Sequence, residues 1–361
     1  MLFLSFTTVL FSFSEYRATR FTRFSESTMR KQAAVRLEGG LGDHILGMRL
    51  LQFVRRRYPG HLMVVYCDCG GYRSQLEAAS MSPFADEIVP VFQDRSKVTA
   101  ENLGSLDNLQ PEYLAKMRQA DAFIDAWPGP PFCSESREIS PAFLYIPQSG
   151  QLGVPYYHIL ASRPRLKIPR GSDAEAAHWI NFSLQGKYIA INFEKLGADG
   201  LREQFYWLRP FLLRLLEDSS VTLINIFSRR MDFPHYPEDL QLMRRNVAAS
   251  ACEAVSEICT WHSRIIPLVD DVQRPMSVQT LAAILEKCHY FIGVDNGLKH
   301  LAWALRIPRT FFFPCHPNAY VISRWMPDYH RAVFLDAIEG QWPSLAGAIG
   351  ASLVKSPRPP Y

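Results

Sequence analysis

Two short stretches of the chain combine glycines with carboxylate, amide or cationic side chains. In "RLEGGLGD" (36–43), glycines precede Asp43, and in "VDNGLKH" (294–300), Asp-Asn-Gly precedes Lys299 and His300. Glycines between a strand and a helix let a ligand approach the backbone, and the free N–H groups of a helix N-terminus attract anions. The two stretches therefore suit a phosphate-bearing ligand, and a carboxylate in such a turn can accept a proton.

Each of these residues also has a simpler structural interpretation. Asp43 stands where a helix N-cap is expected, and that alone would explain an aspartate. A single histidine is more often structural, although the first-turn position of His300 predicts a ring that faces a cleft. Glu38 either lines the acceptor side of the first turn or is simply exposed. The spacing "GGLGD" is not GxGxxG, so its indication of a dinucleotide is weak.

The elements that must position these stretches alternate between strand and helix. Strands are predicted at 33–37, 62–66, 87–91, 121–126, 187–193, 221–227, 265–268, 290–294 and 310–313. Helices are predicted at 43–58, 71–80, 111–119, 172–184, 207–217, 237–260, 278–287, 298–305 and 342–353. Because this alternation builds parallel sheets covered by helices, the sequence predicts an α/β protein with two Rossmann-like domains whose parallel sheets face a central cleft.

A change in composition predicts the boundary between the two domains. Residues 127–170 contain "WPGPP", "YIPQSG" and "SRPRLKIPRG", which is typical of loops and linkers. We therefore predict an N-terminal domain with its linker at 29–170, a C-terminal domain at 171–340, and a final helix and tail at 341–361.

Residues 1–28 differ from the rest of the chain. The apolar run "MLFLSFTTVLFSF" is too short to span a bilayer and lacks the basic residues that precede a secretory core. An interfacial anchor and a weak signal are open interpretations. We favour a third, in which translation starts at Met29 and the upstream residues form a non-core extension.

Composition and charge exclude some classes of function. The 361 residues are 48% hydrophobic and 20% charged, which is typical of a globular protein with a large core. A net charge of +4 permits an anionic ligand or membrane surface but does not indicate nucleic-acid binding. The cysteines number seven and show no CxxC pair, so we expect buried thiols in a reducing, cytoplasmic compartment and no metal site.

Longer segments around the two stretches resemble glycosyltransferase family 9, the lipopolysaccharide heptosyltransferases. "GLGDHILGMRLLQFVRRRYPG" is similar to the family's N-terminal segment, in which a Gly-Asp pair opens the first helix. "FIGVDNGLKHLAWALRIPRTFFF" is similar to its donor-site segment. The order and spacing of the resemblance extend over about 30–340, with specific motifs at both ends and a diffuse middle.

The resemblance implies a GT-B fold, with the acceptor on the first domain and a nucleotide-sugar on the second. It implies an inverting transfer without metal or cofactor, in which Asp43 is the catalytic base. The resemblance and the turns together suggest these site residues: Gly39, Gly40 and Gly42 on the acceptor side, and Asp295, Asn296, Gly297, Lys299, His300, Lys195, Arg202 and Ser228 on the donor side.

The donor segment departs from the family pattern in places. Asn296 stands where the family has a small hydroxyl residue, and Lys299 adds a charge at a variable position. After "KYIAINF" the family often has a His-Pro-Gly-like turn and a lysine, whereas this chain offers Lys195 and Arg202. These departures leave open which residues contact the diphosphate and which nucleotide the donor carries.

The favoured hypothesis is a transferase that moves a heptose-like sugar from a nucleotide-diphosphate donor to a glycan or lipid-linked glycan. The enzyme would be cytoplasmic, with peripheral contact at the inner face of the membrane as an option. A catalytically silent nucleotide- or glycan-binding GT-B module is the alternative. A nicotinamide-dependent Rossmann oxidoreductase is less favoured, because GxGxxG followed by an acidic residue is absent.

Overall fold

The fold is taken from a computed structural model of the chain. It describes residues 31–68, 73–92, 105–126, 146–182, 186–229, 238–294, 296–307, 309–313 and 335–355. Lys31–Tyr361 forms one compact unit that contains both sheets. Within the described residues, no helix is both long and apolar enough to cross a membrane.

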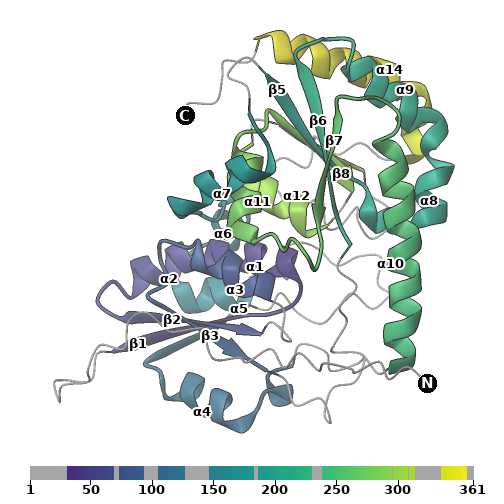
Figure 1. Cartoon of the computed structure of the whole chain (residues 1–361). Coiled ribbons are helices and arrows are strands. Elements are labelled where there is room, and N and C mark those ends of the chain that lie inside the picture. The colour runs from purple at the N-terminus through teal and green to yellow at the C-terminus, as the bar shows by residue number, and fades with distance from the viewer. Residues whose placement is uncertain are drawn as a thin grey trace, which may run out of the picture. The chain divides into compact units, whose positions relative to one another are not determined.

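The first sheet has four parallel strands in the order β3-β2-β1-β4. Its strands are β1 (Gln32–Leu37), β2 (Leu62–Asp68), β3 (Glu87–Val91) and β4 (Ala122–Asp125). Its helical segments are α1 (Leu41–Gly47), η1 (Met48–Leu50), α2 (Leu51–Arg57), α3 (Arg73–Ser80), η2 (Leu106–Asn108), α4 (Pro111–Gln119), α5 (Ile146–Leu152) and α6 (Tyr156–Ala161). Helix α4 lies on one face of this sheet, and α1, α2 and α3 lie on the other (Figure 1).

The second sheet has five parallel strands in the order β7-β6-β5-β8-β9. Its strands are β5 (Lys187–Asn192), β6 (Val221–Ser228), β7 (Ile265–Asp270), β8 (Tyr290–Val294) and β9 (Arg309–Phe313). Its helical segments are α7 (Gly171–Trp179), η4 (Glu194–Leu196), α8 (Ala198–Glu203), α9 (Phe205–Leu215), α10 (Glu238–Ile258), α11 (Val278–Glu286), α12 (Gly297–Ala304) and α14 (Leu335–Lys355). Helices α8, α9, α10 and α14 cover one face, and α7, α11 and α12 cover the other (Figure 1).

Both sheets have the strand order expected of Rossmann-like units, and the predicted α/β class is confirmed. In each sheet the order reverses beside the first strand, between β1 and β4 and between β5 and β8. Ligands of open parallel sheets bind outside the carboxyl ends of the strands at this reversal. The turns singled out in the sequence follow β1 and β8, so both lie at such a reversal.

Several local predictions were wrong. Helices α5 and α6 lie within the stretch predicted to be loop-rich, and α8 was not predicted at all. The helix predicted from Asp43 to Tyr58 begins earlier, at Leu41, and is divided into α1, η1 and α2. At the end of α1, a Cβ on Gly47 would come 2.9 Å from Leu37 Cδ2, so the helix approaches β1 closely there.

Alternate residues of the strands supply separate hydrophobic clusters. In β5, Ile189 and Ile191 belong to the cluster that includes residues of α9 and α10. Tyr188 and Ala190 belong to another cluster, which includes residues of α11 and α12 and also of α1 and α3. This second cluster, here called the shared cluster, therefore contains residues from both sheets. A smaller third cluster lies on the α4 side of the first sheet.

Hydrogen bonds join helices of the two sheets beside the shared cluster. The Glu77 carboxylate of α3 accepts a bond of 2.8 Å from the backbone N–H of Val278, the first residue of α11. The Gln279 amide donates a bond of 2.7 Å to the Ser80 hydroxyl. A carboxylate at a helix N-terminus is favourable because the free N–H groups there carry partial positive charge.

The centre of the first sheet contains a buried ion-pair network. Arg36 of β1 is fully buried and donates to Asp68 of β2 at 3.0 Å and to Asp125 of β4 at 3.2 Å. Asp68 is buried as well, whereas Asp125 is half-buried. The guanidinium therefore joins the carboxyl ends of the central strand and both of its neighbours.

Replacing Arg36 with methionine is expected to destabilise the protein strongly. Removing one partner of a buried ion pair leaves an uncompensated charge and typically costs about 3–5 kcal/mol. Urea unfolding at pH 7 measures the loss. Arg214→Met is the control, because the ion pair between Arg214 and Glu217 is exposed and such pairs contribute about 0–1 kcal/mol. Equal effects of the two substitutions would contradict the importance of the network.

Candidate functional site

Asp43 lies in the first turn of α1, but not at the predicted N-cap. Gly40 is the N-cap residue, and Asp43 occupies the third helical position. From there its Oδ2 atom accepts a bond of 2.9 Å from the Gly40 N–H. The carboxylate thus fixes the turn through the backbone of the N-cap residue and is partly exposed at the carboxyl end of β1.

The glycines of this turn allow the carboxylate to lie close to the backbone. Gly39 has a φ of +91°, and a Cβ at this position would come 2.7 Å from Asp43 Oδ2. A side chain at Gly39 would therefore suffer both an unfavourable φ and a collision. The predicted acceptor-side residues Gly39, Gly40 and Gly42 all belong to this turn or to the first turn of α1.

Two buried titratable groups lie beneath the turn. Glu38 has only 6% of its surface exposed, so the interpretation of Glu38 as an exposed residue was wrong. Burial raises its pKa to about 8, although the nearby positive charge of Arg36 opposes this rise. Burial lowers the pKa of His44 to about 4, and its Nδ1 atom lies 3.2 Å from the Gly40 carbonyl oxygen.

Asn296 organises the turn after β8. It is the N-cap of α12, and its side-chain oxygen accepts a bond of 3.1 Å from the Lys299 N–H. Its amide nitrogen donates to the side-chain oxygen of Asn192, the last residue of β5. The asparagine in place of a hydroxyl residue therefore both caps the helix and bridges the two strands at the reversal. Asp295 lies outside the described residues.

Lys299 and His300 are buried in the first turn of α12. The exposed fraction is 0% for Lys299 and 6% for His300. The prediction that His300 faces a cleft was wrong, because its ring lies against α1: a Cβ on Gly42 would come 2.7 Å from His300 Cδ2. Sequence alone indicated the first-turn position but not the packing partner.

Glu194 is a buried residue of the candidate site that no sequence pattern singled out. It follows β5 directly and accepts hydrogen bonds from the Ser228 backbone N–H and the Asn192 side chain. Burial, the largest influence, raises its pKa to about 7. Its position directly after "KYIAINF" was the available signal. The predicted Ser228 ends β6 beside it, and its hydroxyl donates a bond of 3.3 Å to the Asp270 carbonyl oxygen.

Of the two cations predicted after β5, the structure describes only the side chain of Arg202, which is directed away to α10. Lys195 lies in η4, and its side chain is outside the described part of the structure. Arg202 lies on α8, is exposed, and pairs with Glu257 of α10 at 3.9 Å. The guanidinium of Arg202 is thus directed toward α10.

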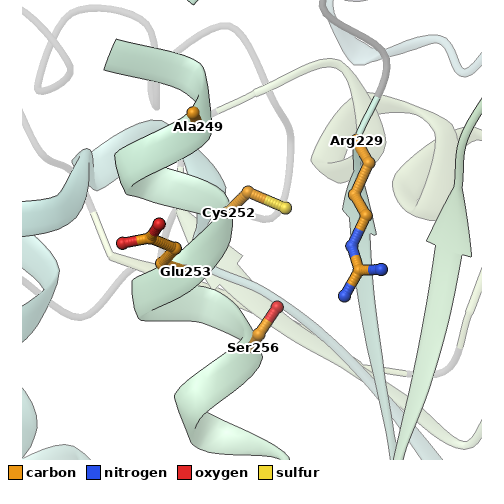
Figure 2. Close-up of a pocket in the computed structure, with 5 residues that line it drawn as sticks. All are labelled: Arg229, Ala249, Cys252, Glu253 and Ser256. Atoms are coloured by element: carbon orange, nitrogen blue, oxygen red, sulfur yellow. The ribbon is translucent and has the colours of Figure 1, made fainter. Parts of the chain in front are cut away.

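A cavity of about 460 Å³ lies between the end of β6 and α10. Its lining residues are Arg229, Ala249, Cys252, Glu253 and Ser256 (Figure 2). Cys252 and Ser256 point toward the side on which Arg229 lies. Burial raises the pKa of the Cys252 thiol, and the neighbouring Arg229 opposes this rise. The cavity therefore combines a guanidinium with a thiol and a hydroxyl at the carboxyl end of the second sheet.

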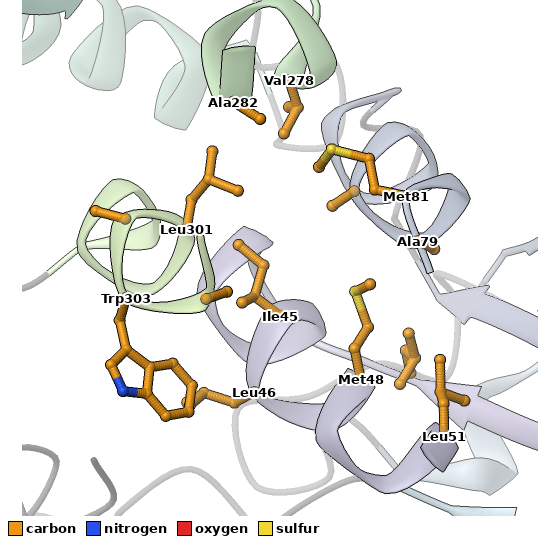
Figure 3. Packing of buried hydrophobic residues seen from close by; sticks show 14 of the residues in the cluster. Ile45, Leu46, Met48, Leu51, Ala79, Met81, Val278, Ala282, Leu301 and Trp303 are labelled. Carbon is orange, nitrogen blue, oxygen red and sulfur yellow. The ribbon is translucent and has the colours of Figure 1, made fainter. Parts of the chain in front are cut away.

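The two predicted turns are in direct contact. Gly42 lies against the His300 ring, and a Cβ on Gly297 would come 3.1 Å from Leu41 Cβ. Figure 3 shows Ile45 and Leu46 of α1 beside Leu301 and Trp303 of α12, within the shared cluster. The N-termini of α1 and α12 therefore meet through small residues, with Asp43 and Asn296 on adjoining turns. Among the described residues, no group of three or more His, Cys, Asp or Glu side chains is arranged to hold a metal ion.

Comparisons with known proteins agree with the fold. Residues 261–318, from just before β7 to just after β9, match the sequence model of "Glycosyltransferase family 9 (heptosyltransferase)". A glycosyl transferase family 9 structure from Veillonella parvula has a TM-score of 0.57 at 15% identity, over 90% of this chain and 98% of that one. The ADP-heptose LPS heptosyltransferase II of E. coli has a TM-score of 0.56 at 13% identity, over 90% and 99%. No curated protein sequence matches the chain.

The contact between the turns can be tested with Gly42→Ala. The added methyl group would collide with His300, so we expect a loss of about 1–3 kcal/mol in the free energy of unfolding. Denaturant unfolding measures it. Gly60→Ala is the matched control, since a Cβ there would meet no atom within 4 Å. The contact would be disproved if Gly42→Ala were as stable as Gly60→Ala.

Proposed function

We propose that this chain, a glycosyltransferase of the family 9 type with a GT-B fold, transfers a sugar from a nucleotide-diphosphate donor to a glycan hydroxyl. The observation that carries the proposal is the contact between the turn that holds Asp43 and the turn that follows β8. Each turn lies at the strand-order reversal of its sheet, where open parallel sheets bind ligands.

In the proposed reaction, Asp43 acts as the general base. Its carboxylate takes the proton of the acceptor hydroxyl as the acceptor oxygen bonds to the anomeric carbon. The bond from that carbon to the donor diphosphate breaks on the opposite face, so the anomeric configuration is inverted. The partial exposure of Asp43 supports this role, because an acceptor can approach the carboxylate. Its bond to the Gly40 N–H holds the carboxylate in one orientation.

The leaving diphosphate would be stabilised from the second sheet. Developing negative charge would be met by the N-terminus of α12, where Asn296, Gly297, Lys299 and His300 lie, and Asp295 would contact the sugar of the donor. Lys195 and Ser228, on the segments after β5 and at the end of β6, would contact the donor. Because Arg202 is directed toward Glu257, we assign it a smaller role than the sequence suggested. The cavity lined by Arg229 lies at the end of β6, next to the proposed donor contact Ser228.

We further propose that the transfer needs neither a metal ion nor a cofactor, since cationic and N–H donors of the chain would serve the diphosphate. A heptose-like donor is supported by the resemblance to heptosyltransferases, and a glycan or lipid-linked glycan is the proposed acceptor. The proposed setting is cytoplasmic, with peripheral membrane contact through basic residues such as Arg56 and Arg57, which are exposed. Arg55 is occupied with the carbonyl oxygens of His61 and Phe84 and with Asp86.

A binding module without turnover is the second candidate function. The burial of Lys299 and His300 favours it, because cationic side chains that are not exposed give a leaving diphosphate less stabilisation. Such a module would bind the nucleotide-sugar or the glycan at the carboxyl ends of the strands but would form no product.

The role of Asp43 is tested by Asp43→Asn. The amide oxygen can still accept from Gly40, so the fold and donor binding should persist. Loss of the base should lower kcat by about 10²–10⁴-fold. Release of nucleoside diphosphate in the presence of acceptor glycans is measured. Asp107→Asn, an exposed residue of η2, is the control. Unchanged turnover in Asp43→Asn would remove Asp43 from the mechanism.

The donor is identified by thermal unfolding with ADP-, GDP-, UDP- and CDP-linked sugars. A ligand at 100 times its Kd stabilises the folded state by about 2.7 kcal/mol, so one nucleotide class should raise Tm. A rise in Tm with product formation supports the transferase, and a rise without product supports the binding module. If no nucleotide-sugar raised Tm, the transferase and a nucleotide-sugar-binding module would both be contradicted.

A further inference from the structure

Glu38 is a buried carboxyl that the proposed reaction does not use. It follows β1 and precedes Gly39, and only 6% of its surface is exposed. Its Oε2 atom has no hydrogen-bond partner among the described residues. At Oε2, an ionised carboxylate would lose its hydration without gaining a donor, which is unfavourable unless a cation pairs with it.

The charged groups that the structure describes around Glu38 do not supply that cation. Arg36 of β1, Asp68 of β2, Asp125 of β4 and Asp43 of α1 all interact electrostatically with it. Arg36 is the only positive group among these four, and it already pairs with Asp68 and Asp125. A charged Glu38 would therefore add a further negative charge to a network whose cation is engaged. Burial is the main cause of the rise of the Glu38 pKa to about 8; Asp68, Asp43 and Asp125 add to the rise, and Arg36 opposes it.

The backbone connects Glu38 directly to Asp43. Gly39 is the next residue, and the Asp43 carboxylate lies so close to it that a Cβ would be 2.7 Å from Oδ2. The following residue, Gly40, donates its N–H to the same oxygen. A change in the charge of Glu38 therefore acts on the turn that orients Asp43, through both the backbone and the electrostatic field.

We propose that Glu38 is a positioning residue: by staying protonated at neutral pH, it leaves Asp43 as the single negative charge of the turn and keeps that turn closed. This inference rests on the proposed function of Asp43 as the base. When Glu38 ionises, its charge repels both Asp43 and an incoming diphosphate. Because an ionised Glu38 is unfavourable where it is buried, it also favours a turn that opens and lets water reach the Glu38 carboxylate. Transfer then declines as the pH rises past about 8.

The first test needs no activity. The folded state holds the Glu38 proton up to pH of about 8, whereas the unfolded state releases it near 4.5. Between these values the folded state binds more protons, so a rising pH favours unfolding. Relative to Glu38→Gln, the folding equilibrium constant of the wild type should fall by up to about tenfold per pH unit in this window. Glu112→Gln, an exposed residue of α4, should keep the wild-type dependence.

The second test follows Asp43 itself. In protein labelled with ¹³C at aspartate carboxyls, the resonance missing from Asp43→Asn identifies Asp43. Its shift should show a step near pH 8 in the wild type and no such step in Glu38→Gln. Likewise, kcat/KM should fall about tenfold per pH unit above the Glu38 pKa in the wild type, and this fall should be absent in Glu38→Gln.

The outcomes separate this inference from the proposed function. If stability depended on pH equally in the wild type and in Glu38→Gln, the inference that the Glu38 carboxyl is protonated at neutral pH would be overturned. An Asp43 resonance without a step, or an alkaline fall in activity that survives in Glu38→Gln, would overturn the positioning role. Absence of transfer at every pH would refute the proposed function instead, and the stability and resonance measurements would still decide whether Glu38 controls the turn.

Discussion

The close approach of the N-termini of α1 and α12 is the constraint on which the candidate site depends. Gly42 lies against His300 and Gly297 against Leu41, so two turns more than 250 residues apart in the sequence adjoin. Small residues are required there because any added side-chain atom would separate the helices. The contact also explains why His300 is buried: its ring fills the space that a larger residue at position 42 would occupy.

Strand order and burial together give each turn its electrostatic character. In the first sheet, Arg36 pairs with two carboxylates, and the turn above it contains two further carboxyl groups, Asp43 and Glu38, of which Glu38 has a raised pKa. In the second sheet, Asn192 and Asn296 join adjacent strand ends without charge, and Glu194 accepts from Ser228. Four acidic side chains, Glu38, Asp43, Asp68 and Asp125, thus lie close together on the first sheet, while the N-terminus of α12 lies on the second. This division suits a base on one side and an anionic leaving group on the other.

Local sequence patterns predicted the strands and most helices, because apolar runs and glycine turns are short-range signals. They placed Asp43 and Asn296 at the correct strand ends. They failed for α5, α6 and α8, which are short helices among prolines and glycines. They also failed for Glu38, His300 and Glu194, since the surroundings of a polar side chain depend on distant segments: Glu38 interacts with charges on β2 and β4, and His300 packs against α1. No local pattern carries that information.

The shared cluster has a consequence for how the molecule can be divided. Its residues come from helices and strands on both sheets, and Glu77 of α3 satisfies the first N–H of α11. Either half expressed alone would expose a broad apolar surface, and the α11 half would also leave a helix end without its acceptor. The two Rossmann-like units are therefore expected to unfold in a single cooperative transition. Exchange of one half with that of a relative would succeed only if the apolar residues on both sides of the junction were exchanged together.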